Sequence, residues 1–195
     1  ANPDHEKALF RARAERDVDA SRQAPSLTVP QALAQACRIL AAEGHESGLA
    51  GQITARADEP GRYWTLPFGT GLDEADPDRM VMVDDDLNPV DPSRGVANPA
   101  TRFHLWVYRA RPDLRAIIHT HPPSISALSM IGEPLKVSHM DATMFADNCA
   151  YLPEWPGLPV ADDEGRIISQ ALGDKQCILL AHHGLLAAGT RVQEA

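Results

Sequence analysis

Two histidine-containing segments, each placed directly after an apolar run, are the part of this sequence best suited to chemistry. His119 and His121 follow the apolar run 114–118, and His183 follows the run 177–180. Because side chains alternate between the two faces of a strand, His119 and His121 are expected to point the same way. Two imidazoles on one face and a third from a neighbouring strand end can close around a divalent metal ion. Coordination positions then stay open for water or substrate, as in a catalytic metal site.

The alternative for any one of these histidines is an ordinary surface or core position, which is the commoner environment for a single histidine. Two features favour a site. Pro122 and Pro123 follow the first pair at once, and the second apolar run also ends in histidine. Strand ends are where binding and catalytic residues gather in layered α/β domains. The spacing therefore predicts a metal site formed by His119, His121 and His183.

The composition is that of one globular domain. The chain has 195 residues, of which 44% are hydrophobic, enough to fill a single core. No apolar run approaches the ~18 residues of a membrane span, and the charged N-terminus has no apolar stretch of signal-peptide type. We therefore expect a soluble, cytoplasmic protein without a membrane partner. The net charge of −9 argues against nucleic acid as a partner, because phosphate neutralisation needs clustered Lys and Arg.

The three cysteines, Cys37, Cys149 and Cys177, are odd in number and lack Cys-x-x-Cys spacing. This pattern argues against a disulfide framework or a zinc knuckle. We therefore expect three reduced thiols.

The chain is expected to have two parts, a charged N-terminal helix or arm over residues 1–27 and a metal-binding domain over residues 28–195. Thr28 and Gln31 have the spacing of a capping box, which predicts a helix from there to about Glu43. Further helices are expected at residues 101–111, 124–130 and 165–172, with the first turn of another at 191–195. Strands are expected at residues 52–56, 63–66, 80–83, 114–118 and 177–180, with 134–138 as a further candidate. The proline-rich residues 151–163 are expected to form a loop.

Together these segments resemble the class II aldolase/adducin superfamily. The matching segments, in consistent order over residues 28–195, are 51–56, 67–69, 103–104, 111–113, 116–121 and 179–185. The resemblance implies an α/β fold of three αβα layers with a central, mostly antiparallel sheet. It also implies a homo-oligomer, often a tetramer, with sites near subunit interfaces. It assigns His119, His121 and His183 as metal ligands and leaves His182 on the opposite face.

The sequence departs from the family pattern at the catalytic carboxylate. In the sugar-phosphate aldolases and epimerases, a carboxylate stands four residues before the position of His104, where this chain has Ala100. Alanine can neither move a proton nor bind a metal. At the positions that hold phosphate in those aldolases, this chain has Gln52, Asn98 and Phe68. Short side chains with hydroxyl donors are replaced there by Pro and Phe, which cannot donate a hydrogen bond. We infer that the substrate is not a sugar phosphate. Gln52 and Phe68 are candidate substrate contacts, and Phe68 would suit a flat or apolar group.

Several other residues are candidates for the chemistry. His139 falls near the family tyrosine that helps to protonate the aldolase intermediate, and His104 lies one helical turn from Ala100. Either could act as acid or base, and a plain core or surface histidine is the alternative for both. Arg102 or Arg56 could hold a substrate carboxylate through a guanidinium fork, with a structural salt bridge as the alternative.

Carboxylates have two possible roles outside the histidine set. Asp141 or another carboxylate could steady a ligand histidine through its second nitrogen, as metal-bound histidines usually require. The triplet at residues 84–86 could bind a cation. Acidic turns between strands are far commoner, and we favour a turn there.

Three neutral imidazoles without a carboxylate leave a metal its full positive charge. Such a centre suits a substrate carboxylate chelated together with its adjacent 2-oxo or 2-hydroxy oxygen. A branch of the superfamily that lacks the aldolase carboxylate resembles non-haem iron oxygenases that oxidatively decarboxylate aromatic 2-oxo acids. We therefore favour Fe(II), with O2 and an aromatic 2-oxo or 2-hydroxy acid as small-molecule partners.

Two other functions stay open at this stage. One is a Zn(II) or Mn(II) lyase, a decarboxylase or an aldolase, acting on a non-phosphorylated substrate, because imidazole suits several metals. The other is a non-catalytic interaction module of the adducin type. The module is disfavoured because adducin-like domains lose the ligating histidines that this chain keeps.

Overall fold

The computed structural model describes residues 3–21, 26–158 and 161–195 of the chain. Its α-helices are α1 (Pro3–Ser21), α2 (Val29–Ala42), α3 (Arg102–Ala110), α4 (Pro123–Met130) and α5 (Asp162–Leu172). Its strands are β1 (Gln52–Arg56), β2 (Arg62–Thr65), β3 (Val81–Asp84), β4 (Ala116–Thr120), β5 (Cys149–Leu152), β6 (Cys177–Leu180) and β7 (Gly184–Gly189). Short 3-10 turns are η1 (Pro77–Arg79), η2 (Pro92–Arg94), η3 (Pro99–Thr101) and η4 (Met140–Phe145).

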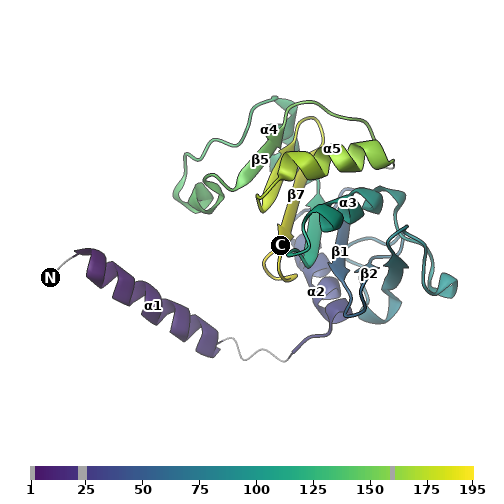
Figure 1. Ribbon diagram of the computed structural model, residues 1–195, viewed down its shortest axis with the longest axis horizontal. Coiled ribbons are helices and arrows are strands. Elements are labelled where there is room, and N and C mark those ends of the chain that lie inside the picture. Colours follow the sequence, from purple (N-terminus) through teal and green to yellow (C-terminus); the bar gives the residue numbers. More distant parts are fainter. Residues whose placement is uncertain (1–2, 22–25, 159–160) are drawn as a thin grey trace.

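The strands form one seven-stranded sheet in the order β3-β2-β1-β4-β7-β6-β5. Every neighbouring pair is antiparallel except β5 and β6, which are parallel. Helix α2 packs on one face of the sheet, and α3 and α5 pack on the other (Figure 1). The expected three-layer fold with a mostly antiparallel sheet is confirmed.

Helix α2 forms where the capping box predicts it. The Thr28 side chain accepts a hydrogen bond from the backbone N–H of Gln31, and the Gln31 side chain accepts one from the backbone N–H of Thr28. This reciprocal pair satisfies two N–H groups that a helix start leaves unpaired. The apolar side of α2, with Leu33 and Cys37 fully buried, packs against Ile53 and its neighbours in the sheet.

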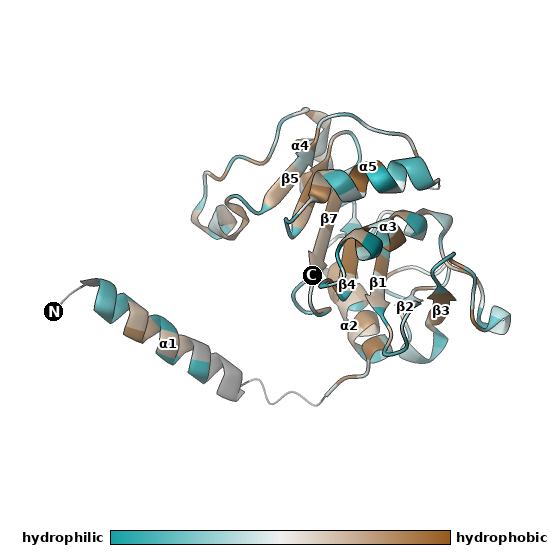
Figure 2. Ribbon diagram, in the orientation of Figure 1, coloured by the Kyte–Doolittle hydropathy of each residue, from teal (hydrophilic) through white to brown (hydrophobic). Residues whose placement is uncertain are grey.

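The opposite face of the sheet carries the larger core. Phe103 and Tyr108 of α3 and Ile168 of α5 are buried against it, together with Ile117 of β4. In Figure 2 the ribbons of α3 and α5 carry both hydrophobic and hydrophilic colouring, as expected for helices with one face on a core. Strand β4 is buried along its whole length, as expected for a central strand covered on both faces. The histidines at its end are therefore anchored to a fully buried central strand.

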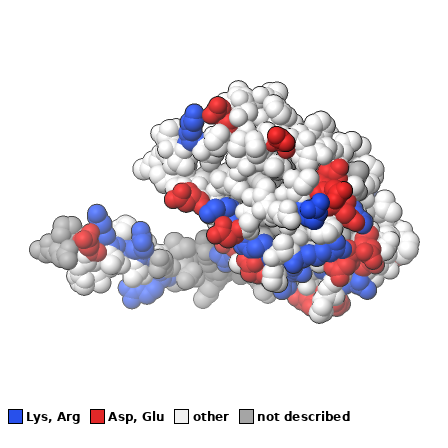
Figure 3. All heavy atoms as spheres, turned by 45° about the horizontal axis from the view of Figure 1, so that its top comes forward, with Lys and Arg blue, Asp and Glu red and all other residues white. Residues whose placement is uncertain are grey.

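Helix α1 lies apart from the sheet and its helices (Figure 1). Its side chains from Asp4 to Arg13 are exposed. Within the described part of the chain, no helix is both long and apolar enough to cross a membrane. On the face shown in Figure 3, Lys and Arg side chains lie among Asp and Glu side chains.

The sequence predictions fail in three places. Strand β7 follows the second histidine pair directly, but its composition of Gly, Leu and Ala lacks the β-branched and aromatic residues typical of strands. Strand β5 includes the first two residues of the expected loop 151–163, because parallel pairing with β6 extends it. Residues 134–138 are not a strand. Residues 191–195 form a single turn, in which the backbone N–H of Ala195 donates a hydrogen bond to the carbonyl oxygen of Arg191, as expected for the first turn of a helix.

Candidate metal centre

Three neighbouring backbone segments position the histidines. His119 is the fourth residue of β4 and pairs with Gln52 of β1 and Leu186 of β7. His121 lies one residue beyond the end of β4. His183 is the last residue of the tight turn that joins β6 to β7. The β6–β7 hairpin folds this turn against the end of β4, and the three side chains meet there.

The three rings form one compact cluster. One nitrogen from each of His119, His121 and His183 lies within 4.8 Å of the others. The Nε2 atoms of His119 and His121 are 2.9 Å apart, and the ring centroids lie 4.7 to 4.9 Å from one another. A divalent ion bound about 2.1 Å from each nitrogen brings ligand nitrogens to roughly 3–4 Å from one another. The residues present therefore fit such an ion.

The second nitrogen of His119 is fixed by the backbone. Its Nδ1 lies 2.8 Å from the carbonyl oxygen of Leu185. A carbonyl oxygen only accepts hydrogen bonds, so Nδ1 carries the proton and the lone pair is on Nε2, which faces the cluster. The sequence suggested a carboxylate such as Asp141 for this role, but a strand carbonyl takes it. A backbone partner holds the ring equally well.

The cluster is electrostatically suited to a cation. Burial, followed by the like charges of His183 and His121, holds the pKa of His119 well below its usual value. Burial also lowers the pKa of His121, and it lowers the pKa of His183 to about 4. Imidazoles that stay neutral keep their lone pairs free for a metal. The metal-ligating group found among the described residues consists of these three histidines, and no carboxylate joins it.

Gly184 lets the hairpin turn approach the end of β4. A Cβ atom at this position would lie 2.5 Å from Cδ2 of His121 and 2.8 Å from the carbonyl oxygen of Thr120. Only a residue without a side chain allows that contact. The glycine after His183 is therefore a requirement of the cluster rather than an ordinary turn residue.

A cavity of about 340 Å³ opens beside the histidines. Its other lining residues are Leu49, Ala50, Gly51, Gln52, Phe68, Asn98, Ala100 and Leu158. The structure thus brings two of the predicted substrate contacts, Gln52 and Phe68, to the cluster. It also places Ala100, the residue at the family carboxylate position, in the wall of the same cavity. Leu158 belongs to the proline-rich loop, and nothing in the sequence indicated that it would reach the site.

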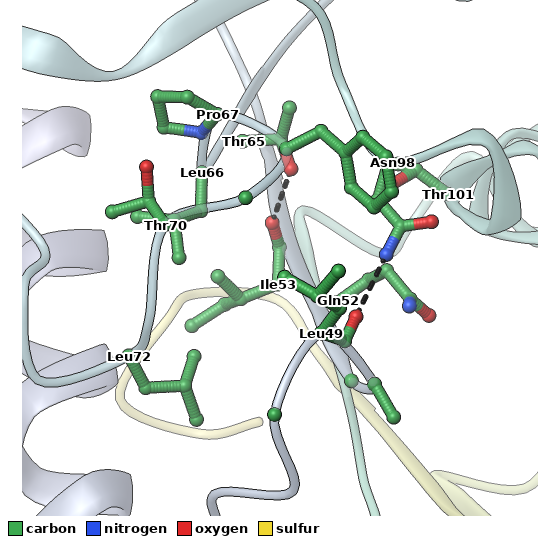
Figure 4. Close-up of a pocket in the computed structure, with 15 residues that line it drawn as sticks. Leu49, Gln52, Ile53, Thr65, Leu66, Pro67, Thr70, Leu72, Asn98 and Thr101 are labelled. Atoms are coloured by element: carbon green, nitrogen blue, oxygen red, sulfur yellow. Dashed lines mark hydrogen bonds between the residues drawn. The ribbon is translucent and has the colours of Figure 1, made fainter.

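Gln52, Phe68 and Asn98 also border a smaller hollow next to this cavity, shown in Figure 4. The Asn98 side chain donates a hydrogen bond to the carbonyl oxygen of Leu49. Gln52 is 8% exposed, and its Oε1 atom is buried without a hydrogen-bond partner. Thr101, another lining residue of the hollow, has a buried Oγ1 atom that is equally unpartnered. A buried acceptor without a donor is costly, so this corner of the site is suited to a ligand group that donates a hydrogen bond.

His104 is buried behind the site rather than in the cavity wall. Its Nδ1 atom lies 2.9 Å from Oγ1 of Thr54, which lies 2.9 Å from the hydroxyl of Tyr108. Its Nε2 atom is buried and unpartnered. Burial lowers the pKa of His104 to about 3. The ring is therefore neutral in the folded protein and serves as a hydrogen-bonding group.

The other two predicted site residues do not reach the cavity in this structure. His139 is exposed at the N-terminal cap of η4, where its Nδ1 accepts a hydrogen bond from the backbone N–H of Asp141. Arg102 forms a 2.7 Å ion pair with Asp162. The Asp162 carboxylate also accepts a hydrogen bond from Trp106. Arg102 therefore forms a structural salt bridge, the second of the two roles considered from the sequence.

Two further candidates have structural roles. Arg56 donates hydrogen bonds to the carbonyl oxygens of Leu114 and Tyr108 and so ties β1 to the segment around α3. Asp84, the first residue of the carboxylate triplet, accepts hydrogen bonds from the backbone N–H groups of Asp86 and Asn88. This is the arrangement of an acidic turn.

Comparison with known proteins identifies the family. The family model described as the class II aldolase and adducin N-terminal domain matches residues 31–195. A 4-hydroxy-3-prenylphenylpyruvate oxygenase/4-hydroxy-3-prenylbenzoate synthase of Streptomyces roseochromogenus subsp. oscitans is 34% identical over 152 residues, covering 77% of this chain and 55% of the relative. A 3,4-dihydroxyphthalate decarboxylase of Arthrobacter keyseri is 30% identical over 175 residues, covering 85% of this chain and 71% of the relative.

Among solved structures, the L-fuculose 1-phosphate aldolase of Glaciozyma antarctica PI12 superposes with a TM-score of 0.75 at 29% identity. The superposition covers 84% of this chain and 64% of the aldolase. The chain thus spans little more than half of the oxygenase and about two thirds of the aldolase. Since the family model covers nearly the whole three-layer domain and the solved aldolase shares its fold, this chain belongs to the class II aldolase and adducin N-terminal domain family.

Proposed function

We propose that this chain forms the metal site of a carbon–carbon bond-cleaving enzyme. The favoured activity is that of a non-haem Fe(II) oxygenase that oxidatively decarboxylates an aromatic 2-oxo or 2-hydroxy acid. The observation that carries this proposal is the cluster of His119, His121 and His183 with Ala100, not a carboxylate, in the wall beside it. The relative named as a prenylphenylpyruvate oxygenase supports the oxidative branch.

The three histidines would hold the metal through neutral imidazole nitrogens. When bound, Fe(II) supplies Lewis-acid polarisation of a 2-oxo group and the redox capacity for reaction with O2. The protein contributes orientation. The Leu185 carbonyl fixes the ring of His119, and the small side chain of Ala100 leaves space where a fourth ligand would otherwise stand.

The cavity lining supports a substrate without phosphate. Among the described residues that line it there is no Lys or Arg, and most of the wall is apolar. A phosphate dianion is usually bound by cationic side chains or by several N–H donors. Phe68, which is 47% exposed, presents an aromatic ring that suits stacking against an aryl group.

Gln52 is proposed to recognise a hydrogen-bond donor on the substrate. Its unpartnered oxygen lies next to the metal cluster, because Gln52 pairs with His119 across the sheet. A hydroxyl group on the ring or side chain of the acid would satisfy this oxygen. Gln52→Leu is then expected to raise KM for a hydroxylated substrate by roughly tenfold, while the metal content stays unchanged. An unchanged KM would exclude this contact.

The test of the main proposal separates oxidative from non-oxidative chemistry. Protein purified without metal is loaded anaerobically with Fe(II), Zn(II) or Mn(II) and given aromatic 2-oxo acids such as 4-hydroxyphenylpyruvate. Decarboxylation of the 2-oxo acid to a carboxylic acid supplies two electrons, and hydroxylation of the adjacent benzylic carbon supplies two more. One O2 should therefore be consumed for each CO2 released, with both oxygen atoms in the 2-hydroxy acid product and no external reductant. We expect turnover only with Fe(II) and O2. Equal turnover under strict anaerobiosis would rule out the oxygenase.

The second candidate function is a Zn(II) or Mn(II) lyase, either a decarboxylase or an aldolase. The relative named as 3,4-dihydroxyphthalate decarboxylase and the aldolase fold neighbour favour it. This function predicts CO2 release or retro-aldol cleavage without O2, at a rate that follows the Zn(II) or Mn(II) content. The same anaerobic titration therefore distinguishes the two functions.

A further inference from the structure

Two cysteines lie side by side on adjacent strands, outside the histidine cluster. Cys149 begins β5, Cys177 begins β6, and the two residues are direct partners in the parallel ladder. Neighbouring strands are about 4.8 Å apart, and disulfides join Cα atoms roughly 4.4–6.8 Å apart. The strand register therefore places the Cα atoms of the two cysteines in the range that disulfides span.

The pair lies on the face of the sheet opposite His119. Ile178 pairs with Leu186, and Leu186 pairs with His119, so these three residues share one face. Cys177 is the neighbour of Ile178 and points to the other face. There, both cysteines line a cavity of about 380 Å³ together with residues such as Phe145. The thiols are thus separated from the metal site by the sheet.

The two thiols differ in their environment. Cys149 is half-buried, and Cys177 is 4% exposed. The hydrogen bond from the Cys177 thiol lowers the pKa of Cys149 to about 7, although burial opposes this shift. The same hydrogen bond, followed by burial, raises the pKa of Cys177. Cys149 is therefore the more accessible and the more readily ionised of the two sulfurs, which suits it to attack an oxidant, and the buried Cys177 beside it suits the resolving role.

We propose that Cys149 and Cys177 form a peroxide-reactive dithiol, a modification site in which Cys149 attacks the oxidant and Cys177 resolves the product. The Cys149 thiolate attacks one oxygen of hydrogen peroxide, the O–O bond breaks, and hydroxide leaves. Cys149 is then a sulfenic acid. The Cys177 sulfur displaces its hydroxyl as water, and the disulfide forms while the earlier hydroxide takes up the proton that Cys149 had released. Two thiols are oxidised by two electrons, one peroxide is reduced, and two waters result.

The test is peroxide titration of the reduced, metal-free 195-residue chain, followed by intact-mass and tryptic peptide analysis. We expect the wild type to lose two hydrogen masses and to yield one peptide pair linked through Cys149 and Cys177. Cys177→Ser should leave a Cys149 sulfenic acid that dimedone captures. Cys149→Ser should abolish the linked pair. A linkage between two chains, seen on non-reducing gels in place of the internal pair, would overturn the proposal.

Cys37 supplies a matched control within the same chain. It is fully buried under α2, and burial raises its pKa to about 12. Before oxidation, iodoacetamide should alkylate Cys149 at least about tenfold faster than Cys37. Cys37→Ser should leave the yield of the Cys149–Cys177 link unchanged. Equal alkylation rates for Cys149 and Cys37, or loss of the link in Cys37→Ser, would contradict the assignment. This result does not depend on the proposed metal chemistry.

Discussion

At the scale of single residues, the function proposed for this chain depends on which histidines share a cation. His182 and His183 are neighbours in sequence but differ in environment. His183 is half-buried within the cluster, whereas His182 is exposed and has a positive φ of 58° in the turn. This difference makes His182 a natural control for the ligand assignment.

His121→Ala is expected to remove most of the bound metal and, with it, turnover. The remaining two imidazoles cannot hold the ion firmly, and the expected loss of affinity is at least about 100-fold. His182→Ala should keep both metal and activity. Metal per chain is measured by elemental analysis of protein purified anaerobically. Full metal occupancy in His121→Ala would remove His121 from the ligand set.

His104 should make stability depend on pH on the acid side. Its pKa is about 3 in the folded protein because of burial and about 6.5 when unfolded. Between these values the unfolded chain binds the proton and the folded chain does not, so stability falls as pH is lowered from about 6.5 toward 3. The slope from this group is about 1.4 kcal/mol per pH unit.

His104→Asn keeps a polar partner for Thr54 and removes the titrating group. In this variant we expect the free energy of unfolding to fall less steeply as the pH is lowered from about 6 to about 4. The difference in slope corresponds to the uptake of roughly one proton on unfolding. Urea titrations at several pH values measure the slope. If the slope is the same in both proteins, His104 does not titrate across this range on unfolding.

At the scale of elements, the β6–β7 hairpin decides whether His183 reaches β4. The turn carries the histidine, and β7 pairs with β4 along five residue pairs. Gly184, the first residue of β7, is where the hairpin and β4 come closest. The metal cluster is thus an outcome of strand pairing rather than of a local motif.

Gly184→Ala should therefore weaken both the site and the fold. The added methyl group would overlap the His121 ring and the Thr120 carbonyl, at a cost of about 1–3 kcal/mol. We expect a lower free energy of unfolding and reduced metal affinity, measured by urea titration and by metal titration. A variant that binds metal as tightly as wild type would show that the turn can move without loss of the cluster.

At the scale of the whole molecule, we expect the three-layer domain to fold without the N-terminal helix. Helix α1 has exposed side chains and lies away from the sheet in Figure 1. Helix α2, by contrast, is part of the core. Removing residues 1–27 is therefore expected to leave the thermal midpoint and metal content of the remainder unchanged. A large fall in the midpoint would show that this segment contributes to the fold.

The segment 130–145 exposes several large apolar side chains and is our candidate surface for self-association. They are Met130, Ile131, Val137, Met140, Met144 and Phe145. Clustered exposed apolar residues are typical of interfaces, and the family resemblance implies a homo-oligomer. Light scattering during gel filtration is expected to give a multiple of 21.2 kDa.

Substitution of this segment tests the surface directly. Met140→Lys combined with Met144→Lys should lower the measured mass toward that of one chain, because each lysine would have to be buried in the interface. Phe10→Lys, at a 75% exposed position on α1, is the matched control and should leave the mass unchanged. A monomeric wild type would exclude self-association of this chain.

The sequence alone determined the features that depend on short-range pattern. The capping box predicts α2, apolar periodicity predicts α3 and α5, and strand alternation puts His119 and His121 on one side. These signals are local, since they arise from the repeat of a helix or a strand. The resemblance of several segments to the class II aldolase/adducin superfamily predicted the layered fold and the set of three ligand histidines.

The tertiary structure alone decided which distant residues meet. In the structure His183 lies in a hairpin turn, and the Nδ1 atom of His119 is hydrogen-bonded to a backbone carbonyl oxygen. His139 and Arg102 lie outside the cavity. The tertiary structure also pairs Cys149 with Cys177 across two strands. Strand register and burial depend on contacts between segments far apart in the chain, and no local pattern encodes them.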